Sequence, residues 1–330
     1  MDVDAKVAKL LSISADQTIA EQLKAKISSK SDFTVFHAFE PNGRITLAHA
    51  LRYAIASKIV AECGGKYILF IADIRASQDM FFNRNEAQIK AAVDYSLKVL
   101  ENLGVKGDHV QVIKSSEFSL NNHELFYQMV SNSIKISIND VQANLPPAGK
   151  KEVLSASKMI APCLHATEIQ FLKADVVICP ENLAKQLDIM KTFDPENVPV
   201  VIPLHSILNL KKTTPVKPDP KNTYFFEDNP SQIGQKSNGA FCTDDVNENP
   251  VFQYIAYLIL PLQGEFEFKG KKYATVEEIS ADFASMDKKE LKGHLAYLVD
   301  QIVDPVRCAF QFEELQPVKE AVAKFNTTIQ

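Results

Sequence analysis

Histidines and cysteines are the side chains of this 330-residue chain that most often act as metal ligands, bases or nucleophiles. Cys163 and His165 stand two residues apart on a predicted helix, so they do not face each other as a thiol and its base would. The sequence contains no GxGxxG or Walker loop. The histidines show neither HxxxH nor HExxH spacing, so we predict no metal site; they are His37, His49, His109, His123, His165, His205 and His294.

The cysteines form an odd set without a CxxC pair, which argues against a disulfide framework and against a zinc site. We expect reduced thiols in the core at Cys63, Cys163, Cys179, Cys242 and Cys308.

Charge and hydropathy restrict the partners and the location of the chain. The 36 basic and 41 acidic residues give a net charge of −5, so a nucleic acid would have to meet a local basic surface. The apolar runs, residues 67–72 among them, are far shorter than the ~20 residues that span a bilayer. The N-terminal segment carries early acids and lacks the apolar stretch of a secretory signal. We expect an intracellular, cytoplasmic protein without a transmembrane helix.

Five short apolar runs alternate with helix-length amphipathic segments in the first two-thirds of the chain. This pattern is typical of βαβ units around a mainly parallel sheet, whose strands are buried on both faces. Helices are predicted over 47–62 and 86–103, each ending before a glycine. The predicted strands are 33–39, 67–74, 110–114, 175–179 and 198–204.

The chain changes character between Leu208 and Ile233, where four prolines and clustered lysines indicate a loop and a domain junction. Beyond it, Asn249 and Pro250 are typical of a helix start, and Asp287 with Glu290 resembles a capping box. The sequence therefore predicts an α/β Rossmann-type domain over 1–229 and a smaller, α-helical domain over 230–330.

Four collinear segments carry a family resemblance. They are FHAFEPNGRITLAHAL (36–51), APCLHATEIQFLKADVVI (161–178), KPDPKNTYFFEDNPSQIGQKSNGAFC (217–242), and NENPVFQYIAYLILP (247–261) followed by LVDQIVDPVR (298–307). Together they resemble the tyrosyl-tRNA synthetases of eukaryotes and archaea, which are class I aminoacyl-tRNA synthetases. The resemblance implies a Rossmann-type catalytic domain followed by an anticodon-binding domain.

The chemistry of that family depends on two signature motifs, because tyrosine attacks the α-phosphate of ATP and the protein supplies positioning and hydrogen-bond donors. The HIGH motif falls on residues 46–49, where Thr46 replaces the leading histidine and His49 remains. The KMSKS motif falls on residues 214–218, where Thr214 replaces the first lysine and Lys217 stands between residues that stiffen the loop. We therefore assign no residue confidently to catalysis.

The amino-acid pocket departs from the family pattern as well. Positions that hold the hydroxyl and ammonium of tyrosine fall on Phe36, Ala161, His165 and Glu168, in place of Tyr, Tyr, Gln and Asp. A following polar element falls on a stretch that includes Asn182 and Leu183. Because Phe36 and Ala161 have no polar side-chain atom, the resemblance does not extend to tyrosine binding in the manner of the family.

The ATP-site positions of the family fall on Ala38, Gly43, His49 and Lys217. Ala38 replaces a glycine that lets the purine approach the backbone. We expect at most weak ATP binding and no tightly bound cofactor.

The anticodon side departs from the family motifs but carries a basic set with one aromatic residue. Such a set can hold phosphates and stack a base, although ordinary solvated lysines explain it equally well. The tRNA-contact candidates are Lys269, Lys271, Lys272, Tyr273, Lys288, Lys289 and Lys292.

These departures resemble the catalytically degenerate half of the tandem tyrosyl-tRNA synthetases of kinetoplastids. We expect a synthetase-like protein of translation that is not itself catalytic and that supports binding of tRNA, tRNA-Tyr by resemblance. One alternative is a divergent, active tyrosine-tRNA ligase that uses ATP with Mg. The other is a regulatory or binding module on the same fold.

The family geometry also implies pairing, because each tRNA lies across two subunits. We expect a homodimer, or a pseudo-dimer with a catalytic tyrosyl-tRNA synthetase half, and no membrane association. The segment 117–151 mixes apolar and polar residues without one stripe, as an element at a subunit contact does. We predict that Leu125, Phe126 and Met129 lie at this contact; an ordinary covering helix is the alternative.

Overall fold

The computed structural model describes residues 1–28, 30, 32–78, 85–144, 155–212, 219–323 and 325. The chain forms two compact units. The first unit comprises Met1–Glu40, Ile59–Met80 and Gly107–Ser206, and the second comprises Pro41–Lys58, Phe81–Lys106 and Ile207–Gln330. The predicted domain boundary at residue 229 stays a prediction, since both units are built from discontinuous segments.

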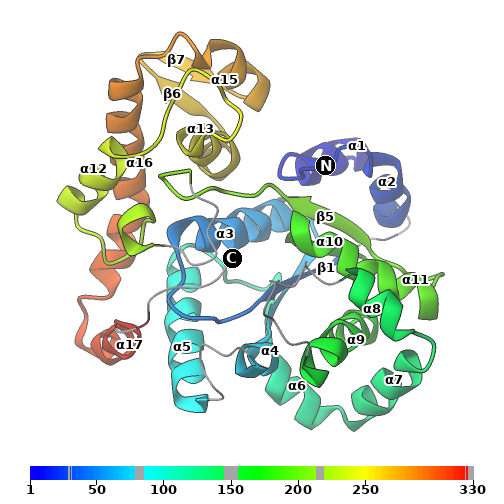
Figure 1. Cartoon of the computed structure of the whole chain (residues 1–330). Helices are drawn as coiled ribbons and strands as arrows, with labels where there is room; N and C mark the ends of the chain where they lie inside the picture. The colour runs from blue at the N-terminus through cyan, green and yellow to red at the C-terminus, as the bar shows by residue number, and fades with distance from the viewer. Residues whose placement is uncertain are drawn as a thin grey trace. The chain divides into compact units, whose positions relative to one another are not determined.

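A five-stranded parallel sheet forms the centre of the first unit (Figure 1). Its strand order is β3-β2-β1-β4-β5, and every neighbouring pair is parallel. The strands are β1 Thr34–Phe39, β2 Lys66–Ile71, β3 Val110–Lys114, β4 Val176–Pro180 and β5 Val200–Leu204. The predicted α/β class with a Rossmann-type parallel sheet is confirmed.

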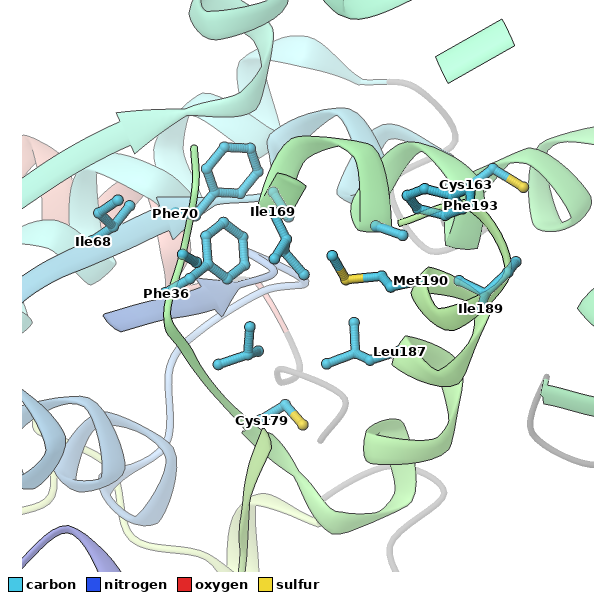
Figure 2. Close-up of a cluster of buried hydrophobic side chains, with 14 of the residues drawn as sticks. Phe36, Ile68, Phe70, Cys163, Ile169, Cys179, Leu187, Ile189, Met190 and Phe193 are labelled. Atoms are coloured by element: carbon cyan, nitrogen blue, oxygen red, sulfur yellow. The ribbon is translucent and has the colours of Figure 1, made fainter. Parts of the chain in front are cut away.

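The strands follow from their composition. β4 is buried at four consecutive positions, and β2 is buried everywhere except at its first residue, as strands covered on both faces must be. On one face, side chains from β1, β2 and β4 pack against helices α9 and α11 in a cluster of buried residues (Figure 2). Phe36, Phe70, Ile169 and Met190 belong to this cluster.

Helices surround the sheet of the first unit. They are α1 Val3–Leu11, α2 Ala20–Ser28, α4 Asp73–Gln78, α6 Ser115–Asn121, α7 His123–Ser133, α8 Ile138–Asn144, α9 Ala156–Phe171, α10 Glu181–Ala184, the 3₁₀ turn η1 Lys185–Ile189, and α11 Met190–Phe193. The division between the units falls within α3, Leu47–Glu62.

The second unit is largely helical, as predicted for the C-terminal region. Its elements outside α3 are α5 Glu86–Asn102, η2 Pro220–Asn222, α12 Pro230–Asn238, α13 Pro250–Tyr254, the π-helical turn η3 Ile255–Ile259, α14 Leu260–Gln263, the hairpin of β6 Phe266–Phe268 and β7 Lys271–Tyr273, α15 Val276–Phe283, α16 Lys288–Ala309, η4 Glu313–Leu315 and α17 Gln316–Val322.

Helix starts in the second unit carry side-chain caps, and two of them lie at the predicted positions Asn249 and Asp287. The side chain of Asn249 accepts the N–H of Phe252 at 3.2 Å, with Pro250 at the first helical position. Thr275 and Glu278 form a capping box at α15. Asp287 accepts the N–H of Glu290 at 2.8 Å and caps α16.

The cysteines are free, and Cys63, Cys163 and Cys179 are buried as predicted. Cys308 is exposed, so it is not the core thiol that we expected. Within the described residues, no helix is long and apolar enough to cross a membrane. The same residues contain no group of three or more His, Cys, Asp or Glu side chains placed to hold a metal ion.

Candidate functional site

The residues aligned with the tyrosine pocket come from two neighbouring elements of the first unit. Phe36 lies on β1 and is fully buried. Ala161, His165 and Glu168 follow one another on α9 at spacings of four and three residues, which places them on one face of the helix. The hydroxyl of Ser155 caps this helix by accepting the N–H of Lys158. The structure therefore brings together the residues that the sequence singled out.

Aromatic packing fills the space between these elements. The Phe36 ring lies 5.0 Å from the Phe70 ring, centroid to centroid, and the two lie side by side in Figure 2. The imidazole of His165 also contacts Phe36, with 5.5 Å between the two ring centroids. Since Phe36 has no hydroxyl, this wall offers no hydrogen bond to a phenol.

Glu168 is the acidic residue among these tyrosine-site equivalents, and its side chain is only 3% exposed. Burial raises the pKa of Glu168 from 4.5 to about 8; nearby Asp73 adds to this rise, and Arg75 opposes it. The Nδ1 atom of His165 lies 3.6 Å from the carboxyl of Glu168. Burial, with a smaller effect of Arg75, also holds the pKa of His165 well below its usual value. At neutral pH both groups are therefore mainly uncharged.

Asp73 and Arg75 were missed in the sequence analysis, although a signal was present. They follow directly on β2, at the carboxyl end of a parallel strand, where ligand-binding residues of such sheets gather. The carboxylate of Asp73 accepts hydrogen bonds from the N–H of Ser116 at 2.9 Å and from the Ser115 hydroxyl at 2.5 Å. These bonds tie α4 to the start of α6. The Nε atom of Arg75 is buried and has no hydrogen-bond partner among the residues that the structure describes.

The remaining predicted residues of the first unit lie on strand and helix ends. Ala38 is half-buried on β1, directly beside Phe70 of β2. Asn182 and Leu183 lie on α10, which follows the carboxyl end of β4. Asn182 is exposed, and Leu183 packs against the buried cluster of Figure 2.

The HIGH-equivalent residues belong to the second unit and have local structural roles. The hydroxyl of Thr46 accepts the N–H of His49 at 3.2 Å and so caps the start of α3. The Nε2 atom of His49 lies 3.3 Å from the hydroxyl of Tyr53, one turn further along the helix. Burial, with a contribution from Arg52, lowers the pKa of His49 to about 3. This imidazole is therefore neutral at physiological pH.

The remaining ATP-site equivalents are Gly43 and Lys217. Gly43 has a φ of +142°, a conformation that favours glycine. Thr214 and Lys217, the KMSKS equivalents, lie outside the described residues.

The lysines proposed to contact tRNA lie close to acidic side chains. Ion pairs join Lys269 to Glu290, Lys271 to Asp282, Lys272 to Glu265 (2.7 Å) and Lys288 to Asp244 (3.2 Å). Lys292 donates to the carbonyl of Asn238 at 3.4 Å, and Lys289 is exposed. The positive charge of these lysines is thus largely balanced by neighbouring carboxylates.

Tyr273 does not fit the role that we predicted for it. Its ring is buried against Phe266, and its hydroxyl donates to Asp282 at 3.0 Å. A buried ring presents no free face to a base, so stacking by Tyr273 is disfavoured.

Comparisons with known proteins show what this chain is similar to. No family model matches the chain. The cytoplasmic tyrosine-tRNA ligases 1 and 2 of Arabidopsis thaliana are each 25% identical to it, over 94% and 88% of the chain. The chain spans 86% of the length of ligase 1 but only 41% of ligase 2.

Solved structures agree with this relationship. Tyrosyl-tRNA synthetase from Aeropyrum pernix superposes with a TM-score of 0.87 at 21% identity, covering 98% of this chain and 99% of its own. The Leishmania major tyrosyl-tRNA synthetase, solved with tyrosinol, gives a TM-score of 0.88 at 23% identity, over 98% of this chain and 60% of its own. In sequence this chain is therefore similar to the tyrosine-tRNA ligases of eukaryotes and archaea, and it shares the fold of tyrosyl-tRNA synthetases.

Proposed function

We propose that this chain is a non-catalytic, synthetase-like subunit or half that binds tRNA and pairs with a second synthetase-like chain. Its relatives are tyrosine-tRNA ligases, which supports tRNA-Tyr as the RNA partner. The active-ligase alternative would require ATP with Mg, and the regulatory-module alternative would require neither tRNA nor ATP.

One observation carries the non-catalytic part of the proposal. At the positions equivalent to the tyrosine site, the Phe36 ring lies against the imidazole of His165, and Glu168 is mainly protonated at pH 7. A site that selects tyrosine needs fixed polar partners for a buried hydroxyl and a charge for the ammonium. Here the aligned positions offer an apolar ring and two neutral groups, so a bound tyrosine would lose hydrogen bonds that water provides.

Pairing is supported by the surface of α7 and the residues that flank it. Monomeric proteins rarely expose large contiguous apolar patches, and interfaces are enriched in aromatic residues. The α7 patch is defined by Leu120, Phe126, Tyr127, Val130, Ile134 and Ile138, which are between 40% and 80% exposed.

The opposite face of α7 holds the helix on its own subunit. Leu125 is 2% exposed and Asn132 is 5% exposed, and the amide of Asn132 donates to Thr167 and Gln170 of α9 at 3.1 and 2.8 Å. Gln128 donates to Gln170 at 2.6 Å. Leu125 is therefore a core residue rather than a contact residue, and this corrects the prediction; Phe126 stays in the proposed contact.

Two measurements on the purified chain test the proposal. Tyrosine-dependent exchange of pyrophosphate into ATP should be absent, while filter binding should detect a complex with tRNA-Tyr. A variant with Phe36→Tyr, His165→Gln and Glu168→Asp, which restores family residues at three positions, serves as the comparison for tyrosine binding by calorimetry.

Clear pyrophosphate exchange by the wild-type chain would establish the active-ligase alternative. No exchange and no tRNA binding would favour the regulatory module.

A further inference from the structure

A large polar cleft lies in the first unit, and Gln128 of α7 and Gln170 of α9 are among the residues that line it. Its volume is about 1150 Å³. Its walls come from α2, from the end of α9 and the residues that follow it, and from the segment that precedes β5. This volume exceeds the roughly 300–1,000 Å³ of typical small-molecule pockets, which suits an extended ligand.

The cleft lies at the amino ends of the strands. Asp175 and Pro199 line it and directly precede β4 and β5, which pair in register from Val176 and Val200. Asn182 and Leu183 follow the opposite, carboxyl end of β4. The cleft and the pair Asn182 and Leu183 are therefore at opposite ends of β4.

Four lysines from three parts of the fold line the cleft: Lys26, Lys30, Lys173 and Lys191. Lys30 pairs with Asp175, and Lys191 pairs with Asp188 at 2.5 Å in an exposed ion pair. Lys26 and Lys173 have no ion-pair partner in the part of the chain that the structure describes.

The two carboxylates that line the cleft are already engaged. Asp175 is buried, and it accepts the N–H of Thr34 at 2.9 Å in addition to the ammonium of Lys30. Asp194 accepts the side-chain amides of Gln170 at 2.6 Å and Asn197 at 2.9 Å. The cleft thus presents more positive than negative charge, with amides beside the lysines.

We propose that this cleft binds the phosphate backbone of RNA without reading its bases. Lysine is a flexible point charge suited to phosphate, and no aromatic side chain lines the described walls to stack a base. The inference rests on the proposed function in that the partner is RNA. The cleft also presents Lys26 and Lys173, which have no ion-pair partner among the described residues, whereas most of the C-terminal lysines are matched by acids.

A local role for the two lysines makes a different prediction. Lys26 lies in the last turn of α2, and Lys173 follows α9 in a left-handed conformation with φ of +51°. Cations at helix C-termini stabilise the helix itself. If that were their whole role, their loss would lower stability and leave RNA binding unchanged.

The test compares two double variants. Lys26→Gln with Lys173→Asn removes two charges, and asparagine tolerates the left-handed conformation at 173. Lys90→Gln with Lys98→Gln removes two exposed lysines of α5 as the charge-matched control. Fluorescence anisotropy with labelled unfractionated tRNA, between 50 and 200 mM salt, gives the dependence of affinity on salt, and circular dichroism verifies folding.

We expect the cleft variant to reduce the slope of log K against log salt by roughly 0.7–0.9 per lysine, with the control unchanged. The cleft assignment would be overturned if the cleft variant kept the wild-type slope, or if the control variant showed an equal reduction. In either case, binding of tRNA by the wild-type chain would still support the proposed function. Conversely, pyrophosphate exchange by the wild type would end the non-catalytic proposal and leave a reduced slope in support of the cleft. Inorganic polyphosphate binding that the cleft variant loses while keeping wild-type tRNA binding would contradict RNA as the ligand.

Discussion

The imidazole of His165 lies against the ring of Phe36, with the ring planes inclined at 55°. Two residues that align with polar tyrosine ligands of the family thus contact each other instead. Glu168, one turn along α9, is buried as well, and this desolvation is the main cause of the raised pKa of its carboxyl group.

Glu168 should make stability depend on pH. Its pKa is about 8 in the folded chain and about 4.5 when unfolded, so between these values the folded state binds more protons. Stability therefore falls as the pH rises from about 5 to 8, by up to about 3 kcal/mol from this group. Glu168→Gln removes the titration, so the variant should gain on the wild type as the pH rises, measured as the difference in urea midpoints at pH 5, 6.5 and 8.

His165 has the opposite effect on the pH dependence of stability, because its pKa is lowered on folding. Its contribution is present above pH 6.5 and is lost as the pH falls. It is common to both proteins, so the difference between them isolates Glu168. A constant difference in midpoint at all three pH values would disprove the raised pKa.

The α7 patch should control association. Phe126→Asp with Ile134→Asp places two charges in the proposed contact, and we expect the dimer to weaken at least tenfold while the chain stays folded, because both side chains are exposed. Light scattering across a concentration series measures the change. Phe312→Asp alters an equally exposed phenylalanine outside the patch and should leave the dimer intact. A wild-type chain that is monomeric at all concentrations, alone and with an active synthetase, would remove the basis for the contact.

Gly65 should not accept a side chain. A Cβ atom there would lie 2.8 Å from the buried ring of Phe33 and 3.0 Å from Val60, so Gly65→Ala should cost about 1–3 kcal/mol. Gly234 lies within α12 with open space around its Cα, and Gly234→Ala should stabilise by about 0.5–1 kcal/mol. In chemical denaturation, we expect the two variants to change the free energy of unfolding in opposite directions. Equal changes would contradict the packing at Gly65.

The ion pair of Lys236 and Asp228 should be essential to the second unit. Both side chains are about nine-tenths buried, with 2.6 and 2.7 Å between the ammonium and the two carboxylate oxygens, and the lysine also donates to the carbonyl of Thr223. Lys236→Met leaves a buried carboxylate unpaired and should cost about 3–5 kcal/mol in a urea titration. Lys90→Met breaks the exposed pair with Asp94 and should cost less than about 0.5 kcal/mol. A small loss at Lys236 would mean that water replaces the ammonium.

Most of the sheet could be predicted because its strands are nearly continuous apolar runs. β2 ends at Ile71 rather than at the predicted 74, since Asp73 accepts hydrogen bonds from the start of α6 and begins α4. The π-helical turn at 255–259 has no comparable signal, because nearly all its residues are apolar and buried.

The role of α7 could not be read from hydrophobic periodicity. Its inner face is held by the amides of Gln128 and Asn132, while aromatic residues such as Phe126 point outward. On α7, amide side chains therefore face the core and aromatic side chains face outward, which partly inverts the usual amphipathic pattern of a helix. For the site, alignment found Phe36, His165 and Glu168. The neutral state of His165 and Glu168 depends mainly on their burial, which the sequence alone does not give.

The π-helical turn has a consequence for how chain length can vary among relatives. A π turn holds one more residue than the α turn that it replaces. The helix that contains it is fixed at one end by the Asn249 cap and at the other by Gly264, which has a φ of +86°. Loss of one residue between 255 and 259 would convert the turn to regular α geometry and leave both ends in place. Alignment gaps of a single residue should therefore collect in this turn rather than elsewhere along the helix.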